Sequence, residues 1–220
     1  MNTREFKEKI YGEFAKVGKS LSSPKRLELL DLLSQSPKSV ESLAKATNMS
    51  IANTSKHLQA LLEAQLVTFS KERNYVYYQL ASESVLKLSL ALRDVAEERL
   101  AGIEETRQRF ILRDNEVEAI TIEKLIEKVK ANTVTLIDVR PAEEYESGHI
   151  PNARSIPVTE LQDHLEMLPK EKGVVAYCRG PYCAYATEAV EYLRMKGYEA
   201  WVLDAGTNEW MQLFGKESIK

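Results

Sequence analysis

Both cysteines of the chain lie in one short segment, Tyr177-Cys178-Arg179-Gly180-Pro181-Tyr182-Cys183-Ala184. The segment follows the apolar run 173–177, which predicts a buried strand, and precedes a helical pattern over 184–196. In such a loop, backbone N–H groups converge on one place, and the dipole of the helix adds positive potential there. The loop therefore favours a thiolate at Cys178, which is the nucleophilic form of the side chain. Because Arg179 adds a fixed positive charge, we expect the loop to hold an anion beside the sulfur.

An inert pair or a zinc site would account for the two cysteines less well. Free cysteines are often buried and inert, but a loop between a strand and a helix argues against that. A zinc site needs about four ligands, and His57, His149 and His164 have no ligand spacing to the loop. We therefore expect no metal and no cofactor.

The sequence also indicates in which cellular compartment the protein works. Its first residues have no apolar core like that of a signal peptide. No uncharged apolar run approaches the ~18 residues that a membrane span needs. We expect a cytoplasmic protein with no membrane partner, in which thiols are usually reduced. A structural disulfide is then an improbable default state, and the pair is expected to serve catalysis or redox chemistry.

The C-terminal half of the sequence has the pattern of an α/β domain. Thr135–Val139 and Val174–Tyr177 are short apolar runs rich in β-branched residues, typical of strands buried on both faces. Helical patterns over 122–129 and 190–195 alternate with these runs, which favours a parallel sheet. Ligands bind at the carboxyl ends of such strands, where Cys178 lies.

The segment Leu136–Ala153 contains the strings Asp-Val-Arg, Glu-Tyr and Gly-His-Ile-Pro-x-Ala. Together with the Cys178 loop and the tail 202–210, it resembles a single-domain rhodanese over about residues 115–220. The resemblance implies a five-stranded, mostly parallel sheet flanked by helices. It also implies sulfurtransferase chemistry, in which Cys178 carries a transferable sulfane sulfur as a persulfide. The partners would be a small sulfane-sulfur donor and a thiol or cyanide-like acceptor.

The loop departs from its relatives in two ways. Phosphatases of this fold carry a closing arginine where this chain has Ala184, so phosphate-ester hydrolysis lacks its guanidinium clamp. Pro181 removes one N–H from the cradle, and Cys183 adds a second thiol that could resolve a Cys178 persulfide or form a disulfide. No general base is needed if the thiolate itself attacks. We expect Asp138 and Arg140 to form a supporting charge pair rather than to be catalytic groups. We also expect a substrate-binding loop around Cys178, formed by Arg179, Gly180, Tyr182, Cys183 and Ala184.

The charge divides the chain into two parts. Residues 1–113 carry 18 Lys and Arg against 14 Asp and Glu, a net charge of +4. Residues 114–220 carry a net charge of −7, which leaves −3 for the whole chain. A mildly basic half suits an anionic partner. We expect one domain over 1–113 and a second over 114–220.

The N-terminal half has the pattern of a winged helix-turn-helix, which is mainly α. Ser23-Pro24 predicts the start of a helix. We expect two short helices at 40–46 and 51–64, separated by a turn. Two strands at 66–70 and 75–80 are then expected to form a hairpin with a charged tip at Lys71–Asn74.

Residues 10–100 are similar to the ArsR-type family of dimeric winged-helix repressors. The strings that carry the resemblance are Leu43-Ala44, Met49-Ser50, Ser55-Lys56-His57-Leu58, 61–67 and 76–80. The resemblance implies a homodimer on a double-stranded DNA operator, with two recognition helices about one DNA turn apart. A winged helix that binds protein is the alternative. Metal sensing is not expected, because this half contains no cysteine.

The predicted DNA contacts lie on the second helix and the hairpin tip. The helix that begins at Ile51 would enter the major groove, with Asn53 and Thr54 nearest the base edges. The helical pattern also turns Thr54 toward the core, which leaves its position open. The remaining contacts, mostly to phosphates, are expected from Ser55, Lys56, His57, Lys71 and Arg73.

Apolar residues recur at helical spacing from Ser84 to Phe110, which predicts one long amphipathic helix. Together with Phe6, Ile10 and Phe14, this helix offers more apolar surface than one small domain covers, which argues for a dimer.

We therefore expect a DNA-binding regulator whose rhodanese domain carries sulfane sulfur on Cys178 and senses reactive sulfur or redox state. One alternative is a sulfurtransferase tethered to DNA without signalling between the halves. The other is a rhodanese domain that has lost catalysis and only docks a partner, which intact Cys178, Arg179 and Gly180 disfavour.

Overall fold

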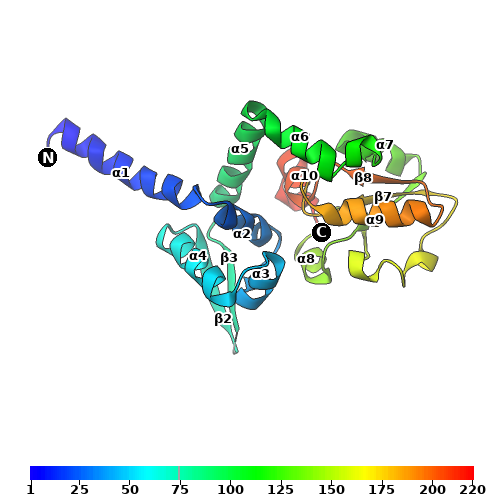
Figure 1. The fold of residues 1–220 in the computed structure, drawn as a ribbon, viewed down its shortest axis with the longest axis horizontal. Coiled ribbons are helices and arrows are strands. Elements are labelled where there is room, and N and C mark those ends of the chain that lie inside the picture. The colour runs from blue at the N-terminus through cyan, green and yellow to red at the C-terminus, as the bar shows by residue number, and fades with distance from the viewer. Residues whose placement is uncertain (74) are drawn as a thin grey trace. The chain divides into compact units, whose positions relative to one another are not determined.

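The computed structural model describes residues 1–73 and 75–220. The chain divides into two compact units, Met1–Val95 and Ala96–Lys220. Figure 1 labels the α-helices and some of the strands of both units. Among the described residues, no helix combines the length and the apolar character needed to cross a bilayer.

The first unit is a winged helix-turn-helix, as predicted. Its helices are α1 (Thr3–Leu21), α2 (Pro24–Gln35), α3 (Val40–Ala46), α4 (Ile51–Glu63) and most of α5 (Glu83–Arg99). Its strands β1 (Lys38–Ser39), β2 (Val67–Glu72) and β3 (Tyr75–Leu80) form an antiparallel sheet in the order β1-β3-β2. The predicted hairpin tip includes Asn74, which lies outside the described residues.

Local sequence signals explain where the central helices begin. Pro24 stands in the first turn of α2, where its missing N–H costs nothing. The side chains of Ser39 and Ser50 cap α3 and α4 by accepting hydrogen bonds from the N–H groups three residues ahead. Leucines from all three helices then form the core of the unit, with Leu29, Leu43 and others fully buried; the further members are Leu30, Leu58 and Leu61.

The predicted single helix from Ser84 to Phe110 is wrong. Two helices, α5 and α6 (Ala101–Phe110), are separated at Leu100, whose backbone is extended with φ −117° and ψ 94°. Two local features fit this break: Gly102 has low helix propensity, and the Leu100 side chain is exposed and thus not held by a core.

Helix α6 belongs to the second unit. Its Arg107 forms an ion pair with Asp204 at 2.5 Å, and Arg113 just beyond it pairs with Glu191 at 3.1 Å. The division between the compact units, at Val95, therefore falls earlier in the chain than the predicted 113/114 boundary.

The second unit is built on a five-stranded parallel sheet, as predicted, in the order β4-β8-β7-β5-β6. The strands are β4 (Ala119–Ile120), β5 (Val134–Asp138), β6 (Arg154–Ser155), β7 (Gly173–Tyr177) and β8 (Ala200–Leu203). The flanking helices are α6, α7 (Ile122–Lys130), α8 (Ala142–Ser147), α9 (Ala184–Met195) and α10 (Thr207–Phe214). Short 3-10 turns occupy Arg113–Asn115, Val158–Glu160, Leu165–Met167 and Lys216–Ser218.

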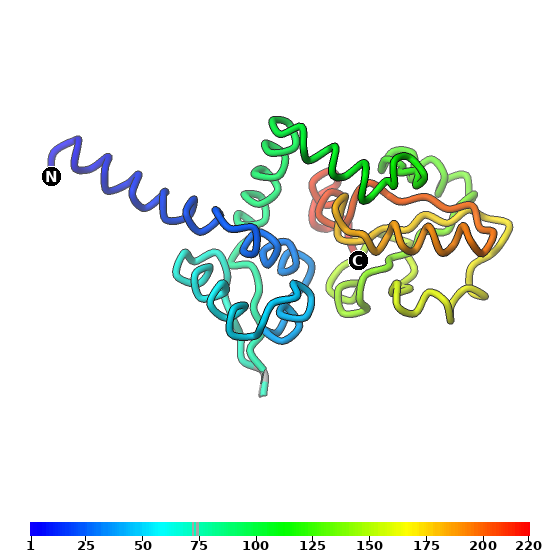
Figure 2. Tube along the Cα trace, viewed as in Figure 1, coloured from blue at the N-terminus to red at the C-terminus, as the bar shows by residue number. Residues whose placement is uncertain are grey.

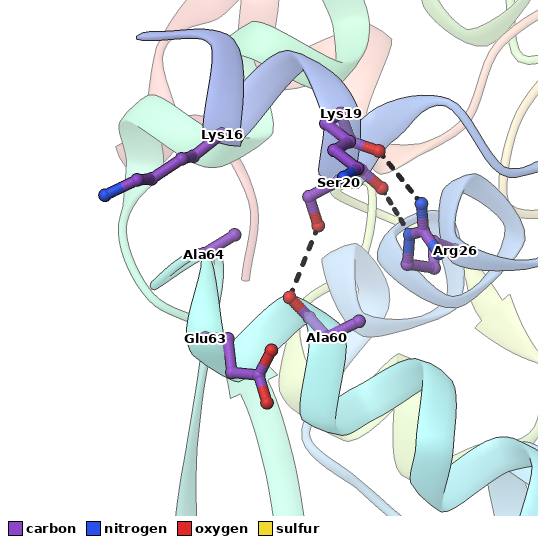
Figure 3. A pocket seen from close by; sticks show the side chains of 7 residues that line it. All are labelled: Lys16, Lys19, Ser20, Arg26, Ala60, Glu63 and Ala64. Carbon is purple, nitrogen blue, oxygen red and sulfur yellow. Dashed lines mark hydrogen bonds between the residues drawn. The ribbon is translucent and has the colours of Figure 1, made fainter. Parts of the chain in front are cut away.

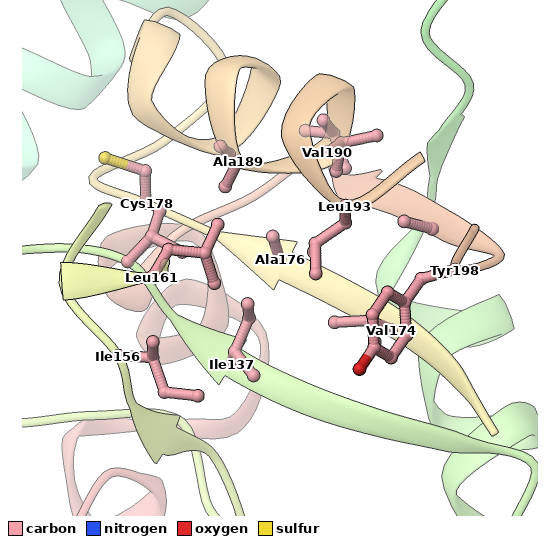
Figure 4. Close-up of a cluster of buried hydrophobic side chains, with 14 of the residues drawn as sticks. Ile137, Ile156, Leu161, Val174, Ala176, Cys178, Ala189, Val190, Leu193 and Tyr198 are labelled. Carbon is pink, nitrogen blue, oxygen red and sulfur yellow. The ribbon is translucent and has the colours of Figure 1, made fainter. Parts of the chain in front are cut away.

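Side chains alternate between two hydrophobic clusters, one on each face of the sheet. Val174 and Ala176 of β7 contribute to the cluster that contains Val190 and Leu193 of α9 (Figure 4). Val175 and Tyr177 contribute to the cluster on the other face. Cys178 continues the first alternation, so its side chain enters the α9 cluster directly after the strand ends.

The end of the described chain is tied to the segment after α8. The backbones of His149 and Lys220 exchange two N–H···O=C hydrogen bonds, each 3.0 Å long. Figure 2 follows the chain through this unit, from green to the red end beside that segment.

Candidate functional site

The two cysteines meet across the turn between β7 and α9. Cys178 is 1% exposed, and a disulfide joins it to Cys183 with 6.1 Å between the Cα atoms. The sequence led us to expect free thiols as the default, whereas here the sulfurs are bonded. The turn is closed by the Cys183 N–H, which donates to the Gly180 carbonyl at 3.2 Å. Gly180 has φ +152°, a conformation that side chains disfavour, which explains a glycine at this position.

Cys183 is also the N-cap residue of α9, and Ala184 is the first residue of that helix. The Cys183 side chain makes no capping hydrogen bond. The positive end of the α9 dipole therefore lies beside the cysteine pair, as the pattern of the loop predicts.

Arg179 is bound to a buried carboxylate. Its guanidinium donates to both Glu144 oxygens at 2.8 to 3.1 Å and lies over the Tyr185 ring, 5.3 Å from the centroid. Glu144 is completely buried. Sequence reasoning missed this partner, although Glu144 lies in the Glu-Tyr string. The role of Arg179 in holding an anion stays a prediction, and Glu144 balances much of its charge.

Asp138 and Arg140 form a second buried ion pair at the end of β5. The Arg140 guanidinium donates to both Asp138 oxygens at 2.6 to 3.1 Å, and to the Gly148 carbonyl at 2.8 Å. Burial acts to lower the pKa of Arg140, but the hydrogen bonds and charge of Asp138 outweigh it and raise the pKa. Neighbouring Tyr177 is buried and close to the Asp138 charge, and both raise its pKa. A pair with both partners wholly buried suits a supporting role.

The tail after β8 packs against the cysteine loop. A Cβ on Gly206 would lie 2.5 Å from the carbonyl carbon and oxygen of Arg179 and 2.7 Å from the carbonyl oxygen of Cys178. Glu209 accepts the Gly206 N–H at 2.6 Å, and its two oxygens lie 3.3 and 3.4 Å from where a Cβ on Gly180 would be. The sequence assigned no role to either residue. An acidic side chain thus stands at the rim of the loop.

Tyr182 connects the loop to the end of α5. Its ring is 43% exposed, and its hydroxyl donates to the Glu97 carboxylate at 2.7 Å. Glu97 lies within the second unit, in the last turn of the helix. Sequence reasoning missed this contact, because no local pattern links residues so far apart.

The structure separates the predicted DNA contacts on α4. Ile51, Asn53, Ser55 and Lys56 are exposed, whereas Thr54 is completely buried and its hydroxyl donates to the Ser50 carbonyl at 3.0 Å. The prediction that Thr54 lies at base edges is therefore wrong, since the helix turns it into the core.

The other predicted contacts are more accessible. His57 is half-buried, and burial together with the positive charges of Arg26, Lys56 and Lys25 lowers its pKa. Both effects disfavour the protonated form of the ring. In the hairpin, Lys71 and Arg73 are exposed.

A cavity of about 350 Å³ lies among α1, α2 and α4, lined partly by Lys16, Lys19 and Glu63 (Figure 3). Arg26 donates to the carbonyls of Lys19 and Ser20, so these polar groups satisfy each other. The cavity lies where three helices pack together, and we assign it no reactive role. Among residues 1–73 and 75–220, no group of three or more His, Cys, Asp or Glu is arranged to hold a metal ion.

Two protein families match different parts of the chain, and one relative matches nearly all of it. Residues 23–68 match the arsR family of bacterial regulatory proteins, and residues 121–213 match the rhodanese-like domain family. The HTH-type transcriptional regulator Rv0324 of Mycobacterium tuberculosis is 41% identical over 201 residues, which cover 91% of this chain and 88% of that protein.

Two further relatives match one half each. The thiosulfate sulfurtransferase GlpE of Coxiella burnetii is 34% identical over 86 residues, 38% of this chain and 78% of its own. The homodimeric winged helix-turn-helix DNA-binding domain of Mb0332 from Mycobacterium bovis is 37% identical, with a TM-score of 0.43. It covers 46% of this chain and 93% of the solved fragment.

The close packing of the tail on the loop predicts the effect of one added methyl group. We expect Gly206→Ala to lower the free energy of unfolding by about 1–3 kcal/mol, because its Cβ overlaps backbone atoms that cannot move alone. The distorted loop should also change the alkylation rate of reduced Cys178. Urea denaturation and timed alkylation measure the two effects.

Gly102→Ala is the matched control, since nothing lies within 4 Å of a Cβ there and alanine favours a helix. It should leave the alkylation rate unchanged. Equal unfolding free energies for wild type and Gly206→Ala would contradict the packing described.

Proposed function

Because the chain belongs to the ArsR-type family of bacterial transcriptional regulators and carries a C-terminal rhodanese-like domain, we propose that sulfur chemistry at Cys178 controls its binding to operator DNA. The observation that carries this proposal is the hydrogen bond from Tyr182, which neighbours Cys183, to Glu97 of α5. As a DNA-binding regulator the protein would work in the cytoplasm, where the bacterial chromosome lies.

The DNA-binding half of the proposal rests on exposed groups of α4 and the hairpin. Helix α4 would enter the major groove with Asn53 toward base edges, while Lys56, Lys71 and Arg73 neutralise phosphates. A homodimer would present two such helices to a two-fold operator.

Two exposed apolar faces support the dimer. One lies on α1 and the other on α5, and both would be covered by a second copy; their residues are Phe6, Ile10, Tyr11, Phe14, Leu88, Leu92 and Val95. The related mycobacterial domain is described as homodimeric.

The sulfur half of the proposal rests on the loop between β7 and α9. A Cys178 thiolate attacks the sulfane sulfur of a donor, the donor group leaves with the electron pair, and the sulfur stays on Cys178 as a persulfide. The N–H groups of the turn and the dipole of α9 favour the anionic persulfide. A relative described as a thiosulfate sulfurtransferase supports this chemistry.

Signalling would then pass through Tyr182. A change in the covalent state of Cys178 or Cys183 alters the turn that carries Tyr182, and its hydroxyl is bonded to α5. Helix α5 also carries Leu88 and Leu92 of the proposed dimer face, so a shift there would change the spacing of two recognition helices. A sulfurtransferase tethered to DNA without signalling is the rival, and the next measurement separates the two.

Operator affinity should depend on the state of Cys178. We expect reduced, persulfidated and disulfide-bonded protein to differ by about 5–150-fold in Kd, the range of ordinary allosteric coupling. Fluorescence anisotropy with labelled operator measures this. Cys178→Ser should bind with one affinity whatever sulfur donor is added. If the three states of the wild type bind within about twofold of one another, the tethered enzyme is the correct description.

Tyr182→Phe tests the route of the signal. The variant keeps the ring but loses the hydrogen bond to Glu97, so sulfur loading of Cys178 should persist while the difference in operator affinity between states shrinks at least severalfold. Glu97→Ala should have the same effect, and the double variant should add little, because both remove one bond. Tyr192→Phe on α9 is the control. A Tyr182→Phe protein with the full affinity difference would rule this route out.

The hairpin contributes a salt-dependent interaction with DNA. Replacing both Lys71 and Arg73 with alanine should reduce the slope of log K against log salt by about 0.9 for each phosphate that the hairpin no longer neutralises, and weaken all DNA sequences alike. A variant with alanine at Lys124 and Lys130 of α7 removes the same charge elsewhere and should keep the slope. An unchanged slope in the hairpin variant would count against the wing.

A further inference from the structure

We propose that Cys183 resolves a persulfide on Cys178, so that the loop reduces sulfane sulfur to sulfide and closes as a disulfide. This inference rests on the proposed sulfur loading of Cys178 and adds an activity to it, the release of sulfide. It also assigns the chemical state that would act as the signal.

The disulfide shows that the Cys183 sulfur reaches the Cys178 sulfur within the folded loop. Cys178 is fixed directly after β7 and is almost wholly buried, whereas Cys183 stands at the start of α9. The turn between them is held by the hydrogen bond from the Cys183 N–H to the Gly180 carbonyl. A thiolate at Cys183 is therefore already placed beside the inner sulfur of a Cys178 persulfide, which no external thiol reaches without entering the buried site.

The step balances without an outside oxidant. The Cys183 thiolate attacks Sγ of Cys178, a sulfur–sulfur bond forms between the cysteines, and the bond to the outer sulfur breaks. The persulfide takes up one proton, and its outer sulfur leaves with the electron pair as hydrosulfide. The sulfane sulfur is thereby reduced to sulfide, and the cysteine pair is oxidised by the same two electrons. A cellular thiol or dithiol then reduces the disulfide and resets the loop.

The charges around the loop favour this outcome. Before the step, a persulfide anion and a second thiolate stand side by side, with the Glu209 carboxylate at the rim. The two arginines of the site each bind a buried carboxylate, Arg179 with Glu144 and Arg140 with Asp138. With the uptake of one proton, closure of the disulfide replaces two anionic sulfurs by a neutral pair and one departing anion, which relieves the repulsion.

The test is single-turnover sulfur loading of the full chain under anaerobic conditions. Reduced protein, freed of reductant, is mixed with thiosulfate and in a parallel series with glutathione persulfide; protein mass after alkylation and released sulfide are measured. The wild type should release close to one sulfide per chain and end as the disulfide, with neither cysteine alkylated. Cys183→Ser should gain one sulfur atom on Cys178 and release only background sulfide. Cys178→Ser should do neither.

The outcomes separate the two proposals. Wild-type protein that keeps the added sulfur, with Cys183 open to alkylation and no sulfide released, overturns the resolving role and leaves sulfur loading intact. Failure of Cys183→Ser and Cys183→Ala to gain sulfur from both donors, with native circular dichroism, overturns sulfur loading itself. The mass and sulfide yield of the wild type decide the resolving role even if a variant misfolds.

Discussion

Arg140 holds together the carboxyl edge of the parallel sheet. One buried guanidinium donates to Asp138 at the end of β5, to the carbonyl of Gly148 after α8, and to the Thr207 hydroxyl of α10 at 3.4 Å. A buried ion pair gives little net stability by itself, but removal of one partner strands the other charge at a cost of about 3–5 kcal/mol. Arg140 therefore fixes the relative positions of three loops, and the cysteine turn is built among them.

The packing around that turn follows from this arrangement. The tail that begins with Gly206 lies against the backbone of Cys178 and Arg179 with no room for a side chain. Arg179 is drawn away to Glu144, and Glu209 stands at the rim. The Cys178 side chain itself lies in the hydrophobic cluster of α9, where its sulfur is bonded to Cys183.

The sequence predicted what local patterns encode. The helix-turn-helix, the hairpin and the parallel sheet are confirmed, because capping serines, apolar periodicity and short β-branched runs indicate these elements locally. The number of strands in the sheet, also confirmed, was implied by the resemblance to a rhodanese. The prediction of one long helix over 84–110 is wrong at Leu100. The apolar pattern continues through this position, although Gly102 and the ion pairs of α6 favour a break there. The prediction that Thr54 contacts bases is wrong, because its position on α4 directs the side chain into the core.

The site was only partly accessible to the same reasoning. The cysteine loop could be located from its position between a strand and a helix. The partners Glu144, Glu209 and Glu97 could not, because each is brought to the loop by tertiary packing, and acidic residues on a surface pattern resemble any solvated face. The disulfide was not the expected state of the two cysteines. The cellular compartment predicts whether thiols are reduced, but it does not predict the distance between the two cysteine sulfurs.

The bond between Tyr182 and Glu97 also affects how this protein can be dissected. Helix α5 ends at Arg99, so a fragment cut just beyond it retains every residue of the helix and of the first unit. In that fragment Glu97 nevertheless lacks its hydrogen-bond donor Tyr182. In the intact chain Glu97 lacks this donor only when the hydrogen bond to Tyr182 breaks. Truncation is therefore not a neutral operation here. Under the proposed coupling, the DNA affinity of this fragment would differ from that of the whole chain, because Glu97 no longer binds Tyr182.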